Sequence, residues 1–294
     1  MKLILSRKGF DSQYGGIPSP VLPDGTLLSL PIPSGPSGVP YAGLVHDGRT
    51  YADIIAELGG KPAAVHGHGH LDPDLRPHGV PGWVPAFGQA GAAQGHLRNQ
   101  GVGVGDLFVF FGRFRRAEPD GAGRLRYVPH APVVHAVFGY LQVGRIVQGE
   151  AIRGYPWHPH ARCDDPNNTL YLASDRLLDT AQPGAGVLPH RDDRVLTAPG
   201  HGVSSWRLLD WMREAPMSYH GPDAVRADHF RAASKGQEFV VEAAPAVLAW
   251  VRAILADAPE PSAWPHGAAA HHLAALGGPD PDASTGIRRR SPQS

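Results

Sequence analysis

Glycine and proline are so frequent in this chain that long uninterrupted helices are excluded over much of it. The 294 residues include 37 glycines and 30 prolines. Proline removes a backbone donor and glycine weakens both helices and strands, so such a chain folds into short elements joined by long loops. The density is high from Arg7 to Gly43, where we expect an extended loop with short strand pieces such as Thr26–Leu30.

Short apolar segments elsewhere predict the strands of a sheet. We expect strands at Lys2–Ser6, Asp106–Phe111, Pro132–Val147, Thr169–Ala173 and Glu238–Glu242. The second and third should form antiparallel ribbons, because the turn-rich segment around Pro119–Gly123 lies between them.

Helices are predicted between these strands. The expected helices are Tyr51–Leu58 with Asp47 or Thr50 as its cap, Gly88–Asn99, Ser204–Arg213 and Pro245–Ala256. Strands and helices alternate without a regular βα period, which favours an α+β fold with a mixed or antiparallel sheet, flanking helices and long loops. We expect one catalytic-type domain over residues 1–257 and a weakly ordered tail over residues 258–294.

Cysteine and charge content narrow the class of protein. The single cysteine, Cys163, excludes an internal disulfide framework and a cysteine-based zinc cluster, and it suits a reducing cytoplasm. Basic and acidic residues number 27 each, so the chain has no strongly basic footprint overall. No apolar run is long enough to span a membrane, and the apolar stretch at the N-terminus is too short for a secretory signal.

A histidine-rich stretch, AVHGHGHLDPDL, is the most conspicuous chemical feature. His66, His68 and His70 alternate with glycine, and Asp72 and Asp74 continue the same alternation. In an extended chain these side chains share one face. Imidazole and carboxylate together suit Fe(II), Mn(II) or Zn(II), so the stretch predicts metal ligands. The alternative interpretation is a solvated polar loop.

Further histidines offer additional ligands. His96 projects from a predicted helix, where it could ligate a metal or form a hydrogen bond between helix and loop. His158 and His160 flank a proline that stiffens the pair, in a loop that can bind a metal or simply form a turn. His135 lies inside an apolar strand, so we expect it to be a core histidine with a satisfied hydrogen bond.

Three residues are candidates for catalysis rather than ligation. Lys8 and Asp11 follow the first strand, where paired glycines let the backbone approach a ligand; Asp11 could be a base, a ligand or a turn former. Glu238 begins a strand and either faces a site or ends the strand in solvent. The sequence around Cys163 lacks the context of a catalytic nucleophile.

Several of these segments together resemble the third nucleotide-modification-associated domain family. The segments include ILSRKGFDSQYGG, HLDPDL, GQAGAAQGHLRNQGVGVGDLFVFFGRFR, FGYLQVGRIV, HPHARCDDPNNTLYLAS and GQEFV, in order from about Leu3 to Val241. The family is named for genomic association with DNA-base-modifying systems, so the resemblance implies a modifying enzyme without naming its reaction. The motif segments contain Asp11, His70, Asp72, Asp74, Gln94, His96, His158, His160, Asn168 and Glu238, whereas His66 and His68 fall outside them.

The leading hypothesis is therefore a metal-dependent, oxidative modifying enzyme. His70, Asp72 and His96, with Asp74, Asp11 or the His158–His160 pair, would hold one or more ions, and this ligand set favours Fe(II). Mn(II) and Zn(II) accept the same ligand types. The Lys8–Gly16 loop would orient a small-molecule, peptide or nucleotide substrate.

Two other hypotheses remain open. A metal-free hydrolase or transferase acting on a nucleotide would use Asp11 or Asp72 as base and His96 or His158 as acid. A nucleic-acid-binding module would use a basic arm made of Arg113, Arg115, Arg116, Arg124 and Arg126. The alternative interpretation of this segment is a solvated hairpin.

Overall fold

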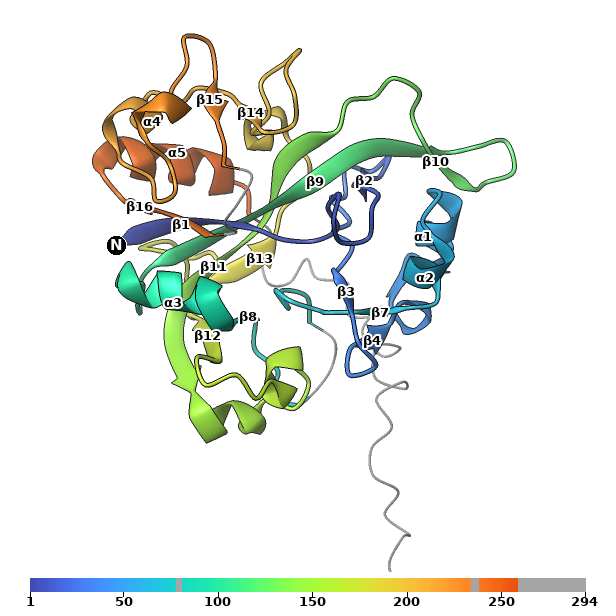
Figure 1. The fold of residues 1–294 in the computed structure, drawn as a ribbon, viewed down its shortest axis with the longest axis horizontal. Coiled ribbons are helices and arrows are strands. Elements are labelled where there is room, and N and C mark those ends of the chain that lie inside the picture. The colour runs from blue at the N-terminus through green and yellow to red at the C-terminus, as the bar shows by residue number, and fades with distance from the viewer. Residues whose placement is uncertain (78–80, 234–237, 259–294) are drawn as a thin grey trace, which may run out of the picture.

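A nine-stranded mixed sheet organises the computed structural model, which describes residues 1–77, 81–233 and 238–258 (Figure 1). Its main path runs β16 (Glu238–Glu242), β1 (Lys2–Arg7), β9 (Leu107–Pro119), β11 (Val134–Gln148), β12 (Thr169–Ala173) and β8 (Ala86–Gln89). Three shorter strands pair beside this path: β2 (Ser19–Val21) and β10 (Leu125–Tyr127) with β9, and β13 (Ala185–Val187) with β11. Strands β1 and β2 run parallel to β9 and the other pairings are antiparallel, so the predicted α+β fold with a mixed sheet is confirmed.

Small elements surround this sheet. The α-helices are α1 (Tyr51–Glu57), α2 (Pro62–Val65), α3 (Gly91–Asn99), α4 (Trp211–Glu214) and α5 (Pro245–Leu255). Two-residue strands form three minor sheets: β3 (Pro33–Ser34) and β4 (Val39–Pro40) with β7 (His68–Gly69), β5 (Val45–His46) with β6 (Arg49–Thr50), and β14 (Ser205–Trp206) with β15 (Phe230–Arg231). No helix in the described ranges is long and apolar enough to cross a membrane.

The two faces of the sheet pack against different apolar clusters. On β9, the alternating residues Leu107, Val109 and Phe111 join a cluster that includes α5 and the buried Trp206. Phe108 and Phe110 point the other way, into a second cluster rich in aromatic rings. Burial on both faces explains why this strand appears in the sequence as a continuous apolar run rather than an alternating one.

Strong curvature brings the two edge strands of the sheet together. Strands β8 and β16 lie at opposite ends of the strand order, yet the Gln89 amide donates to Glu238 Oε1 over 2.7 Å. Helix α3 packs beside β16. The curvature therefore places the ends of both edge strands in one region of the molecule.

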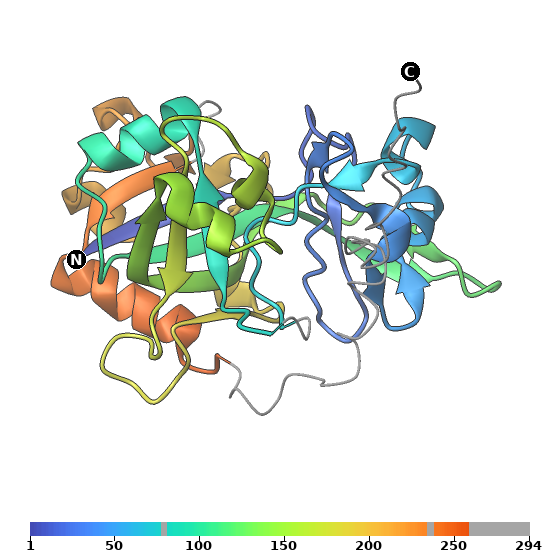
Figure 2. The same cartoon turned by 90° about the horizontal axis from the view of Figure 1, so that it is seen from below.

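Much of the segment between β1 and β8 builds a smaller lobe beside the sheet, in lighter and darker blue in Figure 2. A third apolar cluster fills this lobe, with Phe10, Tyr41 and Ile55 fully buried. Helix α1 begins where the Thr50 hydroxyl accepts a hydrogen bond from the Asp53 amide over 3.0 Å, which confirms Thr50 as its cap. The chain then returns to the sheet through the segment between β7 and β8, which carries His70 and Asp72.

Some sequence-based predictions of local structure are wrong. Ser204–Arg213 is not a helix: Ser205–Trp206 is a strand and helix starts only at Trp211, because Trp206 is drawn into the core beneath the sheet. Thr26–Leu30 forms only an isolated bridge at Leu27. The predicted tail, residues 258–294, lies outside the described residues except for the buried Ala258, and a single domain over residues 1–257 stays a prediction.

His135 is a core histidine, as its strand position predicts. It is 3% exposed, and its Nδ1 accepts a hydrogen bond from the Trp206 indole over 3.0 Å. Burial, with smaller contributions from Arg7 and Arg113, lowers the pKa of His135 to about 3.

This histidine should make the fold sensitive to acid. A neutral His135 stabilises the native state fully above its unfolded pKa of about 6.5, and this stability is lost as the pH falls toward about 3. At about pH 5 the loss amounts to about 2 kcal/mol. The variant His135→Gln keeps an acceptor for Trp206 but has no group at this position that titrates in this range. Between about pH 7 and 5 we therefore expect its free energy of unfolding, measured with urea, to fall by about 2 kcal/mol less than that of the wild type. Equal acid sensitivity of the two proteins would contradict this account.

Candidate metal centre

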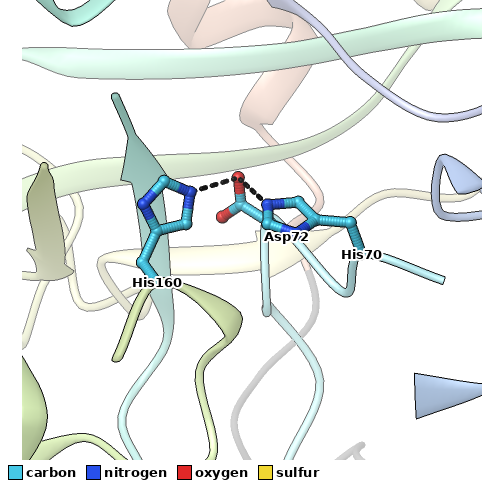
Figure 3. A group of neighbouring side chains, drawn as sticks. All are labelled: His70, Asp72 and His160. Carbon is cyan, nitrogen blue, oxygen red and sulfur yellow. Dashed lines mark ion pairs between the residues drawn. The ribbon is translucent and has the colours of Figure 1, made fainter. Parts of the chain in front are cut away.

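Three side chains from two separate loops converge at the edge of the sheet (Figure 3). His70 and Asp72 follow β7, and His160 lies in the 3-10 turn Pro159–Arg162. Asp72 Oδ2 lies 3.9 Å from His70 Nε2 and 4.0 Å from His160 Nε2. One potential ligand atom from each residue lies within 4.8 Å of the other two.

Asn168 determines the orientation of the His160 ring. Its side-chain oxygen lies 2.6 Å from His160 Nδ1, while its NH2 group donates to the carbonyl oxygens of His160 and Cys163 at 2.8 and 3.0 Å. Because the NH2 group is engaged by two carbonyls, the amide oxygen must face the ring and accept a hydrogen bond from the Nδ1–H group. The neutral ring therefore presents an unprotonated Nε2 toward Asp72.

The other carboxylate oxygen of Asp72 is held by donors. Oδ1 accepts the backbone N–H of Gly88 over 2.8 Å and lies 3.2 Å from Nε2 of the fully buried His158. The angle of this contact is poor, and Nε2 of His158 makes no well-aligned hydrogen bond. The carboxylate is thus oriented so that Oδ2 is left for His70 and His160.

His158 differs from His160 in the ring nitrogen that carries the proton. Its Nδ1 accepts the backbone N–H of His160 over 3.3 Å, which places the proton of the neutral ring on Nε2. A nitrogen that carries a proton cannot ligate a metal. His158 therefore acts as a donor toward Asp72 in this arrangement.

Burial keeps the ligand candidates in the protonation states that a metal requires. Burial is the largest influence on His70 and lowers its pKa to about 4, although Asp72 acts in the opposite sense. Burial also lowers the pKa of His160. Burial alone would raise the pKa of Asp72, but the contact with His158 and the neighbouring imidazoles hold it well below its usual range. At neutral pH the group is two neutral imidazoles and one carboxylate.

Gly88 serves the site through its missing side chain as well as through its N–H. A Cβ at this position would lie 2.2 Å from Cδ2 of the His160 ring, so any other residue forces the ring to move. We expect Gly88→Ala to destabilise the fold by about 1–3 kcal/mol and to weaken metal binding by about 10–100-fold, as loss of an orienting contact does. Calorimetric titration measures the change in metal affinity, and thermal unfolding measures the change in stability. Gly95→Ala is the control, because a Cβ there meets nothing within 4 Å, and equal behaviour of the two variants would refute the steric argument.

A buried ion pair lies next to this group. Lys8 Nζ lies 3.0 Å from Glu238 Oε1, with the two side chains 10% and 1% exposed. The ammonium also lies 4.4 Å from the centre of the Phe87 ring. Its positive charge contributes to lowering the pKa of both His70 and His160, which places it close to the candidate metal centre.

Other predicted site residues lie outside the three-residue group. Asp74 is 2% exposed and accepts the Trp83 indole N–H over 3.0 Å. His96 Nε2 lies 3.0 Å from the Ser218 hydroxyl, and its ring lies 4.2 Å from that of Tyr219. The Asp11 carboxylate accepts the backbone N–H groups of residues 13 and 14, both at 2.7 Å, which is the geometry of a turn-forming aspartate.

Some contributors were not identified from the sequence. Gly88 and Gln89 end strand β8 rather than begin the predicted helix Gly88–Asn99, so their contacts with Asp72 and Glu238 could not be anticipated.

A second, largely exposed group also brings together His201, Asp228 and His229. Asp228 forms ion pairs there with His201 at 3.4 Å and His229 at 2.8 Å. His201 and His229 are remote in sequence, and no motif marks them.

Comparison with known families agrees with the resemblance seen in the sequence. The family model described as nucleotide modification associated domain 3 matches residues 2–242. The chain belongs to this family. The matched range contains the whole three-residue group and the Lys8–Glu238 pair. No curated protein and no solved structure matches the chain.

Proposed function

We propose that this chain is a metal-dependent enzyme that oxidatively modifies a nucleotide or a base of a nucleic acid. The observation that carries the proposal is the contact between His160 Nε2 and Asp72 Oδ2, which are 4.0 Å apart and both bear lone pairs. Two acceptors that face each other in a buried site are stabilised by a cation or a hydrogen-bond donor between them, and a metal ion meets that need. The family description supports the nucleotide as substrate class.

The two separations from Asp72 Oδ2, to His70 Nε2 and to His160 Nε2, lie within the span of two metal–ligand bonds. Bonds from a metal to imidazole nitrogen and carboxylate oxygen are about 2.0–2.2 Å long. One ion can therefore join ligand atoms that lie 3.9 and 4.0 Å apart. We assign the ligands as His70, Asp72 and His160, and His158 as the donor that orients Asp72.

Two histidines and one carboxylate form the ligand set typical of non-haem Fe(II) oxygenases. A bound Fe(II) supplies redox chemistry and open positions for O2 or substrate. Mn(II) and Zn(II) share these ligand preferences, so the metal must be identified by measurement.

The chain's own residues then bind and orient the substrate. The Lys8 ammonium is held in place by Glu238 over 3.0 Å and lies in the electrostatic range of both histidine ligands. A fixed positive charge beside a metal centre orients an anionic or carbonyl oxygen of a bound molecule. We therefore place Lys8 and Glu238 in the catalytic machinery and leave Asp11 in its turn.

Elemental analysis of tag-free protein tests the proposal. We expect about one iron per chain, and loss of activity on nucleotide or nucleic acid substrates after chelation, with products detected by mass spectrometry of digested nucleosides. Substoichiometric iron, manganese and zinc would overturn the metal centre. Full activity after exhaustive chelation would instead favour the metal-free hydrolase or transferase.

Asn168 should be required for tight metal binding although it touches no metal. Removing its side chain in Asn168→Ala frees the His160 ring to rotate and change tautomer, so we expect metal affinity to fall about 10–100-fold. Asn167→Ala is the matched control, because that side chain contacts Arg98 at the surface. Isothermal titration with Fe(II) under anaerobic conditions measures the difference. Equal affinities in the two variants would show that Asn168 does not position the ligand.

A further inference from the structure

The basic arm expected from the sequence divides into two parts in the structure. Three of its arginines pair with two carboxylates within the hairpin of β9 and β10. Arg124 and Arg126 pair with Asp120 at 3.1 and 3.4 Å, and Arg116 lies 3.6 Å from Glu118. The remaining two, Arg113 and Arg115, form no ion pair with any carboxylate of the described residues.

Arg113 and Arg115 lie on one face of β9, between two apolar clusters. On the same face, Phe111 belongs to the cluster beneath the sheet and Ala117 to the cluster of the small lobe. The two arginines therefore lie in the middle of β9, between residues that join the core of the main body and a residue that joins the core of the lobe. Residues two apart in a strand lie on the same side, about 6.6 Å from each other.

Arg113 and Arg115 are half-buried, and each guanidinium group has one buried nitrogen without a hydrogen-bond partner. Nη1 of Arg113 and Nε of Arg115 are buried without a hydrogen-bond partner, while Arg115 Nη2 donates to the Val128 carbonyl over 3.1 Å. The Arg115 guanidinium lies 5.1 Å from the centre of the Tyr127 ring, which limits its movement. Buried donors on a cation are costly unless an acceptor binds them.

Both arginines act electrostatically on neighbouring side chains. Arg113 contributes to lowering the pKa of the buried His135, and Arg115 and Arg113 both act to lower the pKa of Tyr127. Planar guanidinium groups with free donors are suited to binding phosphate oxygens.

We propose that Arg113 and Arg115 form a phosphate-binding site, for adjacent phosphates of a nucleic acid strand or for those of a free nucleotide. The site lies on the opposite face of β9 from Phe108 and Phe110, and it requires no metal. It is therefore independent of the proposed metal centre. Binding should persist in the presence of a chelator and in Asp72→Asn.

Fluorescence anisotropy with a labelled single-stranded oligonucleotide tests this site. The double variant Arg113→Gln/Arg115→Gln should bind at least about tenfold more weakly than the wild type at low salt. Its slope of log affinity against log salt should be smaller by about 1.4, since each phosphate contact on a single strand contributes about 0.7. The matched control is Arg124→Gln/Arg126→Gln, which removes the same charge from the same hairpin.

Competition with a nucleoside monophosphate and with inorganic phosphate shows whether the bound phosphates belong to a nucleic acid strand or to a free nucleotide. If both compete and their binding depends on the two arginines, a free nucleotide is the ligand; if only oligonucleotides bind, the ligand is a strand. Either result supports the site. No binding by the wild type at low salt, or equal losses in the double variant and its control, would overturn it.

A measurement on the wild type guards against misfolded variants. Phenylglyoxal modifies accessible arginines, and mass spectrometry locates the modified residues. A bound oligonucleotide or nucleotide should protect Arg113 and Arg115 while Arg124 remains reactive. Equal modification with and without ligand would count against the site even if both double variants failed to fold.

Discussion

Asp72→Asn should abolish metal binding while leaving the fold intact. The substitution keeps the size of the side chain and an acceptor for the Gly88 N–H, which lies 2.8 Å from Oδ1. It removes the negative charge that faces His70 and His160. We expect the iron content to fall from about one per chain to less than about a tenth, with complete loss of activity. Elemental analysis and thermal unfolding in the presence of a chelator measure the two effects.

His66→Ala is the control for this result. His66 lies in the same histidine-rich stretch but is exposed and falls outside the three-residue group. The variant should retain iron and activity at the level of the wild type. Full iron content in Asp72→Asn, or a comparable loss in His66→Ala, would mean that the metal is bound elsewhere.

Lys8→Met should destabilise the fold more than any surface substitution. It leaves the Glu238 carboxylate, which is 1% exposed, without its cation, and the donors that remain to it among the described residues are Gln89 and Ser6. Removing one partner of a buried ion pair costs about 3–5 kcal/mol. The double variant Lys8→Met/Glu238→Gln should recover part of that loss, because no unpaired charge remains. Urea unfolding of the wild type, Lys8→Met, Glu238→Gln and the double variant gives the coupling energy.

An exposed ion pair provides the contrast. Arg153 and Glu150 lie 2.8 Å apart with side chains 64% and 87% exposed. Arg153→Met should change the free energy of unfolding by less than about 1 kcal/mol. If Lys8→Met were equally mild, the pair beside the candidate metal centre would not be an energetically significant part of the fold.

Local patterns in the sequence were sufficient for the main strands. Thr169–Ala173 and Glu238–Glu242 are observed with the predicted bounds, since short runs of β-branched and apolar residues are bounded by turn-forming ones. The predicted Ser204–Arg213 helix failed because burial of Trp206 and its pairing with Phe230 outweigh local helix propensity. The length of β9 was underestimated because its second half carries arginines that are not typical of a buried strand.

For the site, the sequence alone determined which residue types were available: the His70–Asp72 segment, the His158–His160 pair and the polar residues around them. Only the tertiary structure decided which of these meet. Pairing of Asp74 with Ala86 and the hydrogen bond from Gly88 to Asp72 hold the loop after β7 against β8, which contacts the turn that carries His160, and Gly88 leaves room for that ring. Asn168 and the backbone of His160 then assign opposite tautomers to His160 and His158. Such roles depend on hydrogen bonds between segments remote in sequence, which no local spacing encodes.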